Sequence, residues 1–464
     1  MQNYLIKDIA IVNEGAITEG DVWIKDGRIH QIGRALTPSS AVNEIDGSGK
    51  YLIPGAIDDQ VHFREPGLTH KATINSESRA AVAGGVTSFM EMPNTLPPAF
   101  TQDLLEEKYA IAARSSVANY SFFMGTSNDN ADEALRTNEK RNDVCGIKIF
   151  MGSSTGGLLV DNYLTLTRLF SESGVLIATH CEDERIIKKN YEVLKREKPV
   201  LEPADHAMIR NEEGCFESSF TAVQLAKKFN TRLHILHIST EKELQLFSNM
   251  RPLNEKHITA EVCVHHLHFT SDDYERLGHG IKCNPAIKAP HNREALWRAL
   301  LDDRLDVIAT DHAPHTLEEK GLKRGSGGQL MPLNGNVEGS YEKAHAGLPL
   351  IQHPMLLMLN YVKQGMISIE KVAEKMSHAV ATCFQIENRG FIREGYWADL
   401  VMVDVNKEYV VDQNNLLYKC GWSPLEGFRF PATIEKTFVN GHLVYENGIV
   451  NESSKGQRLK FNRS

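Results

Sequence analysis

The sequence predicts an α/β protein: a (β/α)8 TIM barrel with a small β-sandwich domain built from both chain termini. Two observations predict this fold. Eight short apolar runs, separated by helix-like stretches, recur through the middle of the chain, and strands that alternate with helices form parallel sheets. Both ends of the chain instead carry β-like runs joined by tight turns. The predicted boundaries are residues 1–54 and 389–464 for the small domain and residues 55–388 for the barrel.

The two ends of the chain are expected to form one sheet domain. Near the N-terminus, YLIKDIAIV is followed by DVWIKDGRIHQIG, in which Asp26-Gly27 is a hairpin signal. Near the C-terminus, ADLVMVDV precedes TFVNGHLVYENGIV, where Asn440-Gly441 marks another turn. The final segment, NESSKGQRLKFNRS, is polar and is expected to fray.

The middle of the chain supplies the strands of the predicted barrel. Each strand is a short apolar run, and a helix-like stretch follows it, which is the pattern of consecutive parallel βα units. In chain order the runs are LIPGAIDDQVHF, GVTSFMEMP, NYSFFMGT, GIKIFMG, GVLIATHCE, RLHILHIST, ITAEVCVHHLHF and LDVIATDHAP.

Residue types that do chemistry gather at the C-terminal ends of these apolar runs. In a TIM barrel those ends converge on one face, where active sites lie. On the first strand, alternation places Gln60, His62 and Arg64 on one side and Asp59 on the other. The sequence therefore predicts one polar site at the mouth of the barrel, formed by these residues: His62, Arg64, Asn94, Lys148, His180, His237 and Asp311.

Composition excludes several classes of function. The 464 residues include 51 Lys and Arg against 60 Asp and Glu, and this net charge of -9 argues against nucleic acid or an anionic membrane as a partner. The 7 cysteines form no CxxC pair, so neither a disulfide framework nor a cysteine zinc site is indicated. The sequence contains neither a signal peptide nor a run of roughly 20 apolar residues, and a cytoplasmic protein is expected.

Six motifs in a fixed order resemble those of one enzyme family. HFREPG, MPNT, KIFMGSSTG, THCED, HILHIST and ATDHAPH follow one another along the predicted strands. In this the chain resembles the dihydroorotases of the amidohydrolase superfamily. The resemblance implies reversible, zinc-dependent hydrolysis of the ring amide of (S)-dihydroorotate to N-carbamoyl-L-aspartate, a step of de novo pyrimidine biosynthesis. It also implies a small-molecule substrate and a homodimer.

The resemblance implies a metal centre with one or two zinc ions per chain. In similar proteins a carboxylated lysine bridges two ions, and Lys148 occupies that position. His180 and His237 match the ligands of the more buried ion, while His62 and Asp311 match ligands of the more exposed one. Asp311 also matches the general base and acid. A lone lysine in GIKIF would more often be a snorkelling side chain, and only its neighbours favour the bridging role.

The resemblance also implies which residues bind substrate. Arg64, Asn94 and His315 match residues that bind the substrate carboxylate, and Asn284 matches one that contacts the pyrimidine ring. A planar guanidinium suits this task because it pairs with a carboxylate through two parallel hydrogen bonds. Asn94 is equally explained as a turn residue in MPNTLPP, and both roles are compatible.

Gln60 departs from the family pattern. Most relatives read DxHxH where this chain reads Asp58-Asp59-Gln60-Val61-His62, so one imidazole ligand of the exposed metal is missing. A glutamine carbonyl is a weaker zinc ligand than imidazole. Two outcomes follow: an active enzyme whose exposed metal is bound loosely or is absent, or an inactive scaffold for aspartate carbamoyltransferase. The presence of the other site residues favours activity.

Hydantoinases, dihydropyrimidinases and allantoinases share the expected barrel and ring-amide chemistry. Their substrates differ, because dihydroorotate carries a carboxylate that hydantoin and dihydrouracil lack. A site built to bind that carboxylate would leave polar groups unpaired with a neutral ring, which favours a dihydroorotase.

Overall fold

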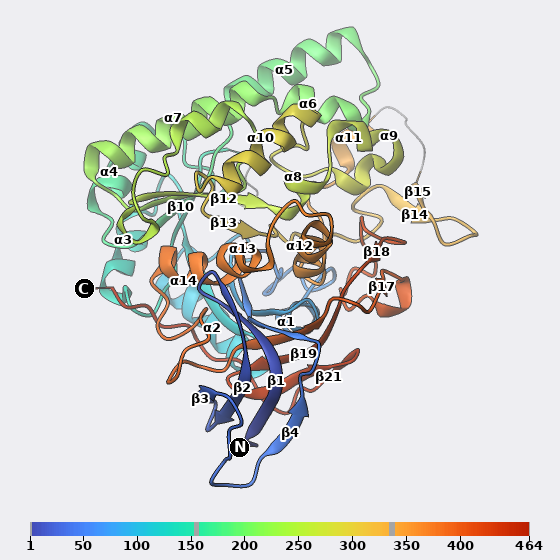
Figure 1. Ribbon diagram of the computed structural model, residues 1–464. Coiled ribbons are helices and arrows are strands. Elements are labelled where there is room, and N and C mark those ends of the chain that lie inside the picture. Colours follow the sequence, from blue (N-terminus) through green and yellow to red (C-terminus); the bar gives the residue numbers. More distant parts are fainter. Residues whose placement is uncertain (1, 153–156, 334–338, 464) are drawn as a thin grey trace.

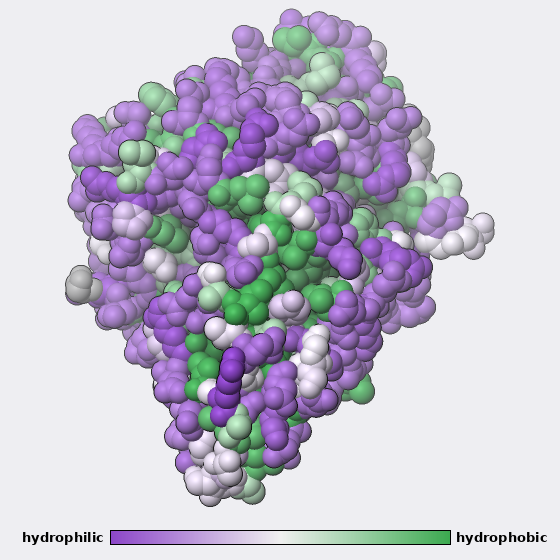
Figure 2. All heavy atoms as spheres, viewed as in Figure 1, coloured by the Kyte–Doolittle hydropathy of each residue, from purple (hydrophilic) through white to green (hydrophobic). Residues whose placement is uncertain are grey.

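The computed structural model describes residues 2–152, 157–333 and 339–463. Figure 1 shows a barrel surrounded by helices, with a second sheet of N-terminal and C-terminal strands below it. Within the described helices, none is long and apolar enough to cross a membrane. On the face in Figure 2, hydrophilic residues cover most of the surface and apolar residues gather in a band down its middle. The end of the KIFMGSSTG motif, residues 153–156, lies outside the described residues.

Eight parallel strands form the barrel, in the order β13-β12-β11-β10-β9-β8-β7-β6. A bridge between Val61 and His312 closes it, and the backbone N–H of His62 donates to the His312 carbonyl at 2.7 Å. Each of the eight predicted apolar runs contains one strand, so the predicted barrel is confirmed. The strands are β6 (Ala56–Val61), β7 (Val86–Glu91), β8 (Asn119–Gly125), β9 (Gly146–Phe150), β10 (Ile177–His180), β11 (Leu233–Ile235), β12 (Ile258–Cys263) and β13 (Val307–Ala309).

Helices cover the outside of the barrel, and local sequence explains where several begin. Thr73 caps the first helix by accepting from the Ser76 N–H, and Asp183 caps α5 in the same way at the N–H groups of Arg185 and Ile186. The longer helices are α1 (Ile74–Ala83), α2 (Gln102–Ser115), α4 (Tyr163–Glu172), α5 (Glu184–Glu197), α7 (Glu212–Phe229), α10 (Pro290–Leu301) and α12 (Pro354–Lys363). Shorter ones are α3 (Ala131–Leu135), α6 (His206–Ile209), α8 (Val264–His268), α9 (Tyr274–Leu277), α11 (Ser340–Lys343), α13 (Ile369–Ala373) and α14 (Ala379–Phe384).

Both chain ends build one nine-stranded sheet, as predicted, in the order β21-β20-β19-β16-β5-β1-β2-β3 with β4 paired to β1. The two halves meet where β16 pairs antiparallel with β5. Asp26 and Gly27 both have positive φ, as a tight hairpin between β2 and β3 requires. The strands are β1 (Tyr4–Asn13), β2 (Ala16–Lys25), β3 (Arg28–Gly33), β4 (Asn43–Asp46), β5 (Tyr51–Pro54), β16 (Leu400–Asp404), β19 (Thr433–Val439), β20 (His442–Glu446) and β21 (Ile449–Val450).

Two small hairpin-like pairs complete the described strands. β14 (Leu322–Arg324) pairs with β15 (Leu330–Pro332), and β17 (Tyr409–Val410) pairs with β18 (Arg429–Phe430).

The C-terminal segment does not fray, and that expectation is wrong. The N–H of Gly456 donates to the Ser116 carbonyl, and the N–H of Leu459 donates to the Tyr120 carbonyl, both at 2.9 Å. Leu459 and Phe461 are buried against the barrel. Two apolar side chains in a polar stretch are enough to dock it, because burial of each contributes on the order of 2 kcal/mol.

Candidate active site

One cavity of about 540 Å³ opens at the C-terminal ends of the barrel strands. The residues predicted to form the site come together there, although they are distributed over more than half of the chain. Lys148 is the exception, since it lies beneath the cavity and is fully buried. The predicted residues that line the cavity are His62, Arg64, Asn94, His180, His237, Asn284, Asp311 and His315, with Gln60 beside them.

Gln60 and His62 both point from the end of β6 toward Asp311. The Gln60 amide nitrogen donates to Asp311 Oδ1 at 3.1 Å, and His62 Nε2 lies 3.1 Å from the same oxygen. Asp59 points to the other side, where its carboxylate lies 3.0 Å from His234 Nε2. The predicted alternation along this strand is therefore confirmed, and Gln60 contacts the carboxylate of Asp311.

The two ring nitrogens of His62 face different partners. Nδ1 donates to Asn94 Oδ1 at 2.7 Å, and burial lowers the pKa of His62, which keeps the ring neutral. A neutral imidazole that donates through Nδ1 carries a lone pair on Nε2. That lone pair and an Asp311 carboxylate oxygen therefore face each other, an arrangement that a cation between them stabilises.

His180 and His237 form a second converging pair. His180 Nδ1 lies 2.9 Å from His237 Nε2, while His180 Nε2 donates to Glu182 at 3.0 Å. Arg210 lies 2.6 Å from the same carboxylate. Although burial opposes the shift, Arg210 and His180 lower the pKa of Glu182 to about 2. Glu182 is thus a fixed anion that directs the free lone pair of His180 into the cavity.

Lys148 lies in the middle of β9 (Gly146–Phe150), not at its end as the sequence predicts, and it lies beneath these pairs. Its Nζ atom has no hydrogen-bond partner among the described residues and lies 4.5 Å from the centre of the Phe150 ring. Burial, opposed by Asp311 and Glu261, lowers the pKa of Lys148 to about 7. Burying an amine without a hydrogen-bond partner costs free energy, so a group that binds this nitrogen would stabilise the protein.

Three residues of the site have backbone conformations that are rare outside glycine. Arg64, His237 and Asp311 have φ values of 68°, 41° and 47°. Such conformations cost about 1 kcal/mol or more and are found where surrounding structure enforces them, often at functional sites.

Arg64 supplies the positive charge on the cationic side of the cavity, and His315 lies beside it. Arg64 donates through Nε to the Pro314 carbonyl at 3.2 Å, and its NH2 group lies 3.1 Å from His315 Nε2. Burial lowers the pKa of Arg64 to about 10, so the guanidinium stays charged at neutral pH. Asn284 lies on the opposite wall, where its side-chain oxygen is 3.0 Å from His206 Nε2.

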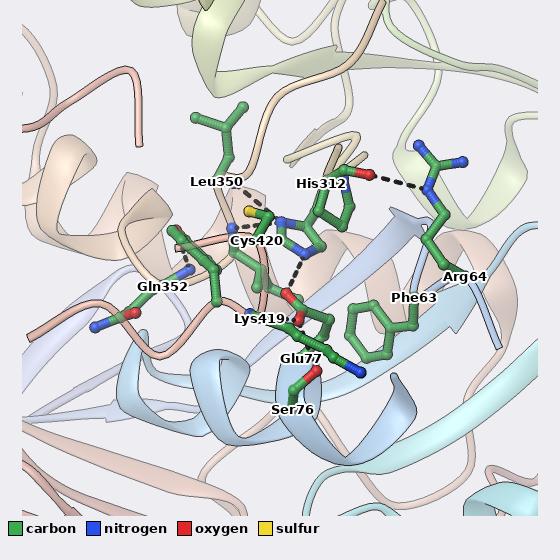
Figure 3. A network of polar contacts seen from close by, with 12 residues as sticks. Phe63, Arg64, Ser76, Glu77, His312, Leu350, Gln352, Lys419 and Cys420 are labelled. Atoms are coloured by element: carbon green, nitrogen blue, oxygen red, sulfur yellow. Dashed lines mark hydrogen bonds and ion pairs between the residues drawn. The ribbon is translucent and has the colours of Figure 1, made fainter. Parts of the chain in front are cut away.

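A buried pair supports the loop that carries Asp311. His312 Nε2 donates to Glu77 Oε2 at 2.8 Å, and His312 Nδ1 accepts from the N–H of Leu350 at 3.0 Å. Figure 3 shows Glu77 reaching from α1 to the His312 ring. Glu77 also accepts from the backbone N–H of Lys419 at 3.1 Å. Helix α1 and the loop that carries Lys419 are thereby tied to the residue next to Asp311.

We predict that Glu77→Leu lowers the free energy of unfolding by about 3 kcal/mol, because it leaves buried donors of His312 and Lys419 unpaired. Glu77→Gln keeps an acceptor and is expected to cost about 1 kcal/mol. Urea unfolding followed by tryptophan fluorescence measures both. Equal stability of wild type and Glu77→Leu would show that this pair does not stabilise the loop.

Gln60→Leu keeps the side-chain volume but removes the amide that donates to Asp311. We predict that kcat falls on the order of 10-fold, with KM nearly unchanged, because support of this kind is typically worth 10–100-fold. Gln60→His, which offers an imidazole, is expected to retain at least the wild-type metal content. Steady-state kinetics and metal analysis test both, and an unchanged kcat in Gln60→Leu would contradict the orienting role.

Several residues around the cavity were missed by sequence reasoning. Glu182 could have been found in THCED, where it follows His180 at the spacing that shares a strand face. Lys71 and Glu319 carry no such signal, and they become neighbours only through the fold. The described residues also bring together three groups of metal-binding types: Asp59–His234–Glu261, Cys263–His265–His266 and His315–Glu319–His345.

Comparison with known proteins agrees with this fold. The chain is 31% identical to a protein named dihydroorotase from Pyrococcus abyssi (strain GE5 / Orsay), over 96% of each chain. It is 32% identical to a dihydroorotase from Pyrococcus furiosus, over 95% of this chain and 92% of that one. A solved structure, an L-hydantoinase (dihydropyrimidinase) from Arthrobacter aurescens, matches with a TM-score of 0.87 at 25% identity, covering 99% of this chain and 100% of that one. Residues 51–444 match the family described as "Amidohydrolase family". This chain belongs to the amidohydrolase family.

Proposed function

We propose that the protein is a dihydroorotase, which hydrolyses the ring amide of (S)-dihydroorotate to N-carbamoyl-L-aspartate and catalyses the reverse ring closure. The observation that carries this proposal is the pairing of Arg64 with His315 in the same cavity as Asp311. Arg64 supplies a charged fork for a carboxylate, and Asp311 supplies a base close to where the ring amide lies. The full-length similarity to dihydroorotases supports the same reaction.

The residues present fit a zinc centre. The lone pairs of His62 and His180 face Asp311 and His237, and the buried Lys148 amine has no hydrogen-bond partner in the part of the chain that the structure describes. A neutral lysine can add carbon dioxide to give an anionic carbamate, and the low pKa of Lys148 favours the neutral form. We infer that His180, His237 and carboxylated Lys148 would hold one ion, and that His62, Asp311 and Lys148 would hold a second where two are bound. When bound, zinc polarises the scissile carbonyl and makes water a better nucleophile at neutral pH.

The chain's own residues then handle the proton and the substrate. A water oxygen bonds to the ring carbonyl carbon while the bond from that carbon to the ring nitrogen breaks. Asp311 accepts the proton that the water loses and donates it to the leaving nitrogen. Gln60 donates to Asp311 Oδ1 and thereby orients the carboxylate of Asp311. Arg64, Asn94 and His315 bind the substrate carboxylate, and Asn284 contacts the ring.

A hydantoinase is the second candidate, because an L-hydantoinase shares the fold over the whole chain. The cationic side of the cavity distinguishes the two. With a neutral ring, Arg64 and His315 would be desolvated without an acceptor, which costs several kcal/mol for a charged group. This favours a carboxylated substrate.

The test is ring opening of dihydroorotate by the purified protein, followed by ultraviolet absorbance, as isolated, after chelation and after zinc is restored. Dihydrouracil and allantoin serve as uncarboxylated controls. Zinc-dependent turnover confined to dihydroorotate is expected. Turnover of the neutral rings instead would favour a hydantoinase or allantoinase, and no turnover with zinc restored would favour a scaffold, for which binding to aspartate carbamoyltransferase would then be measured.

Arg64→Gln is predicted to raise KM for dihydroorotate by about 30-fold, which corresponds to about 2 kcal/mol of lost carboxylate binding. We expect kcat to change less, because the carboxylate is bound in both the ground state and the transition state. Initial rates over a range of substrate concentrations give both constants. A KM within twofold of wild type would contradict the assignment of Arg64.

We also propose a cytoplasmic homodimer, which is what the resemblance to dihydroorotases implies.

A further inference from the structure

His315 lies beside three charged residues, two of them away from the cavity and one at the cavity wall. Lys71 Nζ lies 3.1 Å from His315 Nδ1, and the Glu319 carboxylate lies 3.4 Å from the same nitrogen. Lys71 and Glu319 are themselves paired at 3.0 Å. On the cavity side, Arg64 lies 3.1 Å from His315 Nε2. Lys71 and His315 are buried, so these contacts are shielded from water.

Counting donors and acceptors shows that these contacts cannot all be hydrogen bonds. Lysine and arginine side chains only donate, whereas a neutral imidazole has one donor and one acceptor. Burial and the nearby Arg64 hold the pKa of His315 well below its ordinary value, so the ring is neutral at physiological pH. His315 can therefore accept from Lys71 or from Arg64, but not from both.

The shorter contact on the Nδ1 side is with Lys71. If Lys71 donates to Nδ1, the proton lies on Nε2, and His315 presents an N–H beside the N–H groups of Arg64. Two donors then face one another across 3.1 Å and need a shared acceptor. An anionic oxygen in the cavity supplies that acceptor, and two adjacent donors match a carboxylate.

We propose that Lys71, with Glu319 as its counterion, is a positioning residue that holds His315 in the Nε2–H tautomer, so that His315 and Arg64 both donate to the substrate carboxylate. This inference rests on the proposed function, because it assigns the cationic side of the cavity to that carboxylate. Lys71 itself does not line the cavity and acts through His315.

Two other readings of the cluster are less consistent with its charges. If Glu319 accepted from Nδ1–H across 3.4 Å, His315 Nε2 would accept from Arg64 and would have no donor left for a substrate. A metal ion between His315, Glu319 and His345 would lie beside Lys71, which already occupies the Glu319 carboxylate, and near Arg64. The like charges of Lys71 and Arg64 oppose a cation there.

The experiment measures substrate constants and equilibrium binding for wild type, Lys71→Met, Lys71→Arg and Lys419→Met. Orotate is the carboxylated probe and dihydrouracil the uncarboxylated one, both titrated calorimetrically into the zinc-loaded protein. Lys419 is an exposed lysine whose Nζ contacts the carbonyl of Thr69, in the loop that carries Lys71. Lys419→Met therefore controls for the loss of a lysine that contacts this loop.

For Lys71→Met we expect KM for dihydroorotate and Kd for orotate to rise about 10-fold, kcat to stay within threefold, and dihydrouracil binding to stay unchanged. Lys71→Arg retains a donor and is expected to recover most of the affinity, and Lys419→Met to match wild type. An unchanged orotate Kd in Lys71→Met, or equal losses for both probes, would overturn the proposal.

If Lys71→Met does not fold, Glu319→Ala tests the proposal in its place. The proposal predicts that this variant loses less than about threefold in orotate affinity, because Lys71 still donates to His315. A loss of tenfold or more would show that Glu319 sets the tautomer instead. Failure of the proposed function is visible separately, because wild type itself would then neither turn over dihydroorotate nor prefer orotate to dihydrouracil.

Discussion

Lys148→Ala is expected to lower kcat for dihydroorotate by at least about 1,000-fold, which corresponds to about 4 kcal/mol of transition-state stabilisation. The reason is that this buried amine lies beneath the two converging pairs of the cavity and can become a shared anionic ligand. Without it, two metal sites lose a ligand at once, and metal-ion catalysis supplies several kcal/mol. Metal analysis of the dialysed variant is expected to show less than half of the wild-type zinc.

The matched control is Lys375→Met, which removes another buried lysine, one whose Nζ donates to the Leu305 carbonyl. It is expected to retain zinc and activity, which separates loss of the ligand from loss of a buried amine. Zinc content and kcat in Lys148→Ala close to those of wild type would contradict a bridging role for this residue.

The lowered pKa of Lys148 gives this prediction a pH dependence. Only the neutral amine adds carbon dioxide, and in the metal-free protein the pKa is about 7 instead of its ordinary value near 10.5. The neutral fraction is therefore large at pH 8 and small at pH 6. Reactivation of metal-free protein by zinc and bicarbonate is expected to be faster at pH 8, and equal rates at both values would contradict the assignment.

Asp311→Asn has the second large expected effect, a fall in kcat of about 1,000-fold with a smaller change in KM. The amide has nearly the same shape and can still contact Gln60 and His62, but it cannot accept a proton from water. General acid–base catalysis contributes about 100- to 10,000-fold, and the loss of a metal ligand adds to it.

The pH profile distinguishes this role from simple loss of structure. A general base gives kcat a dependence on pH, and the residual activity of Asp311→Asn is expected to lose that dependence. Asp306→Asn is a suitable control, because Asp306 is a buried aspartate directly before β13. Asp306 pairs with Lys256 and does not line the cavity. A wild-type pH profile in Asp311→Asn would exclude it as the base.

The barrel, the sheet built from both ends and the location of the site near the strand ends could be predicted from the sequence. These features depend on local signals, because short apolar runs that alternate with helix-like stretches predict parallel strands, and parallel strand ends share one face. The positions of Lys148, His180, His237 and Asp311 followed from this rule without knowledge of any contact.

Which side chains pair across that face could not be predicted and follows from the three-dimensional packing. Gln60 contacts Asp311, and Lys71 contacts His315, across more than 240 positions of the chain. Docking of the C-terminal segment against the barrel was decided in the same way. Such contacts depend on rotamers, loop conformation and close packing. Shifts smaller than the width of one atom make or break them, and they produce no periodic pattern in the sequence.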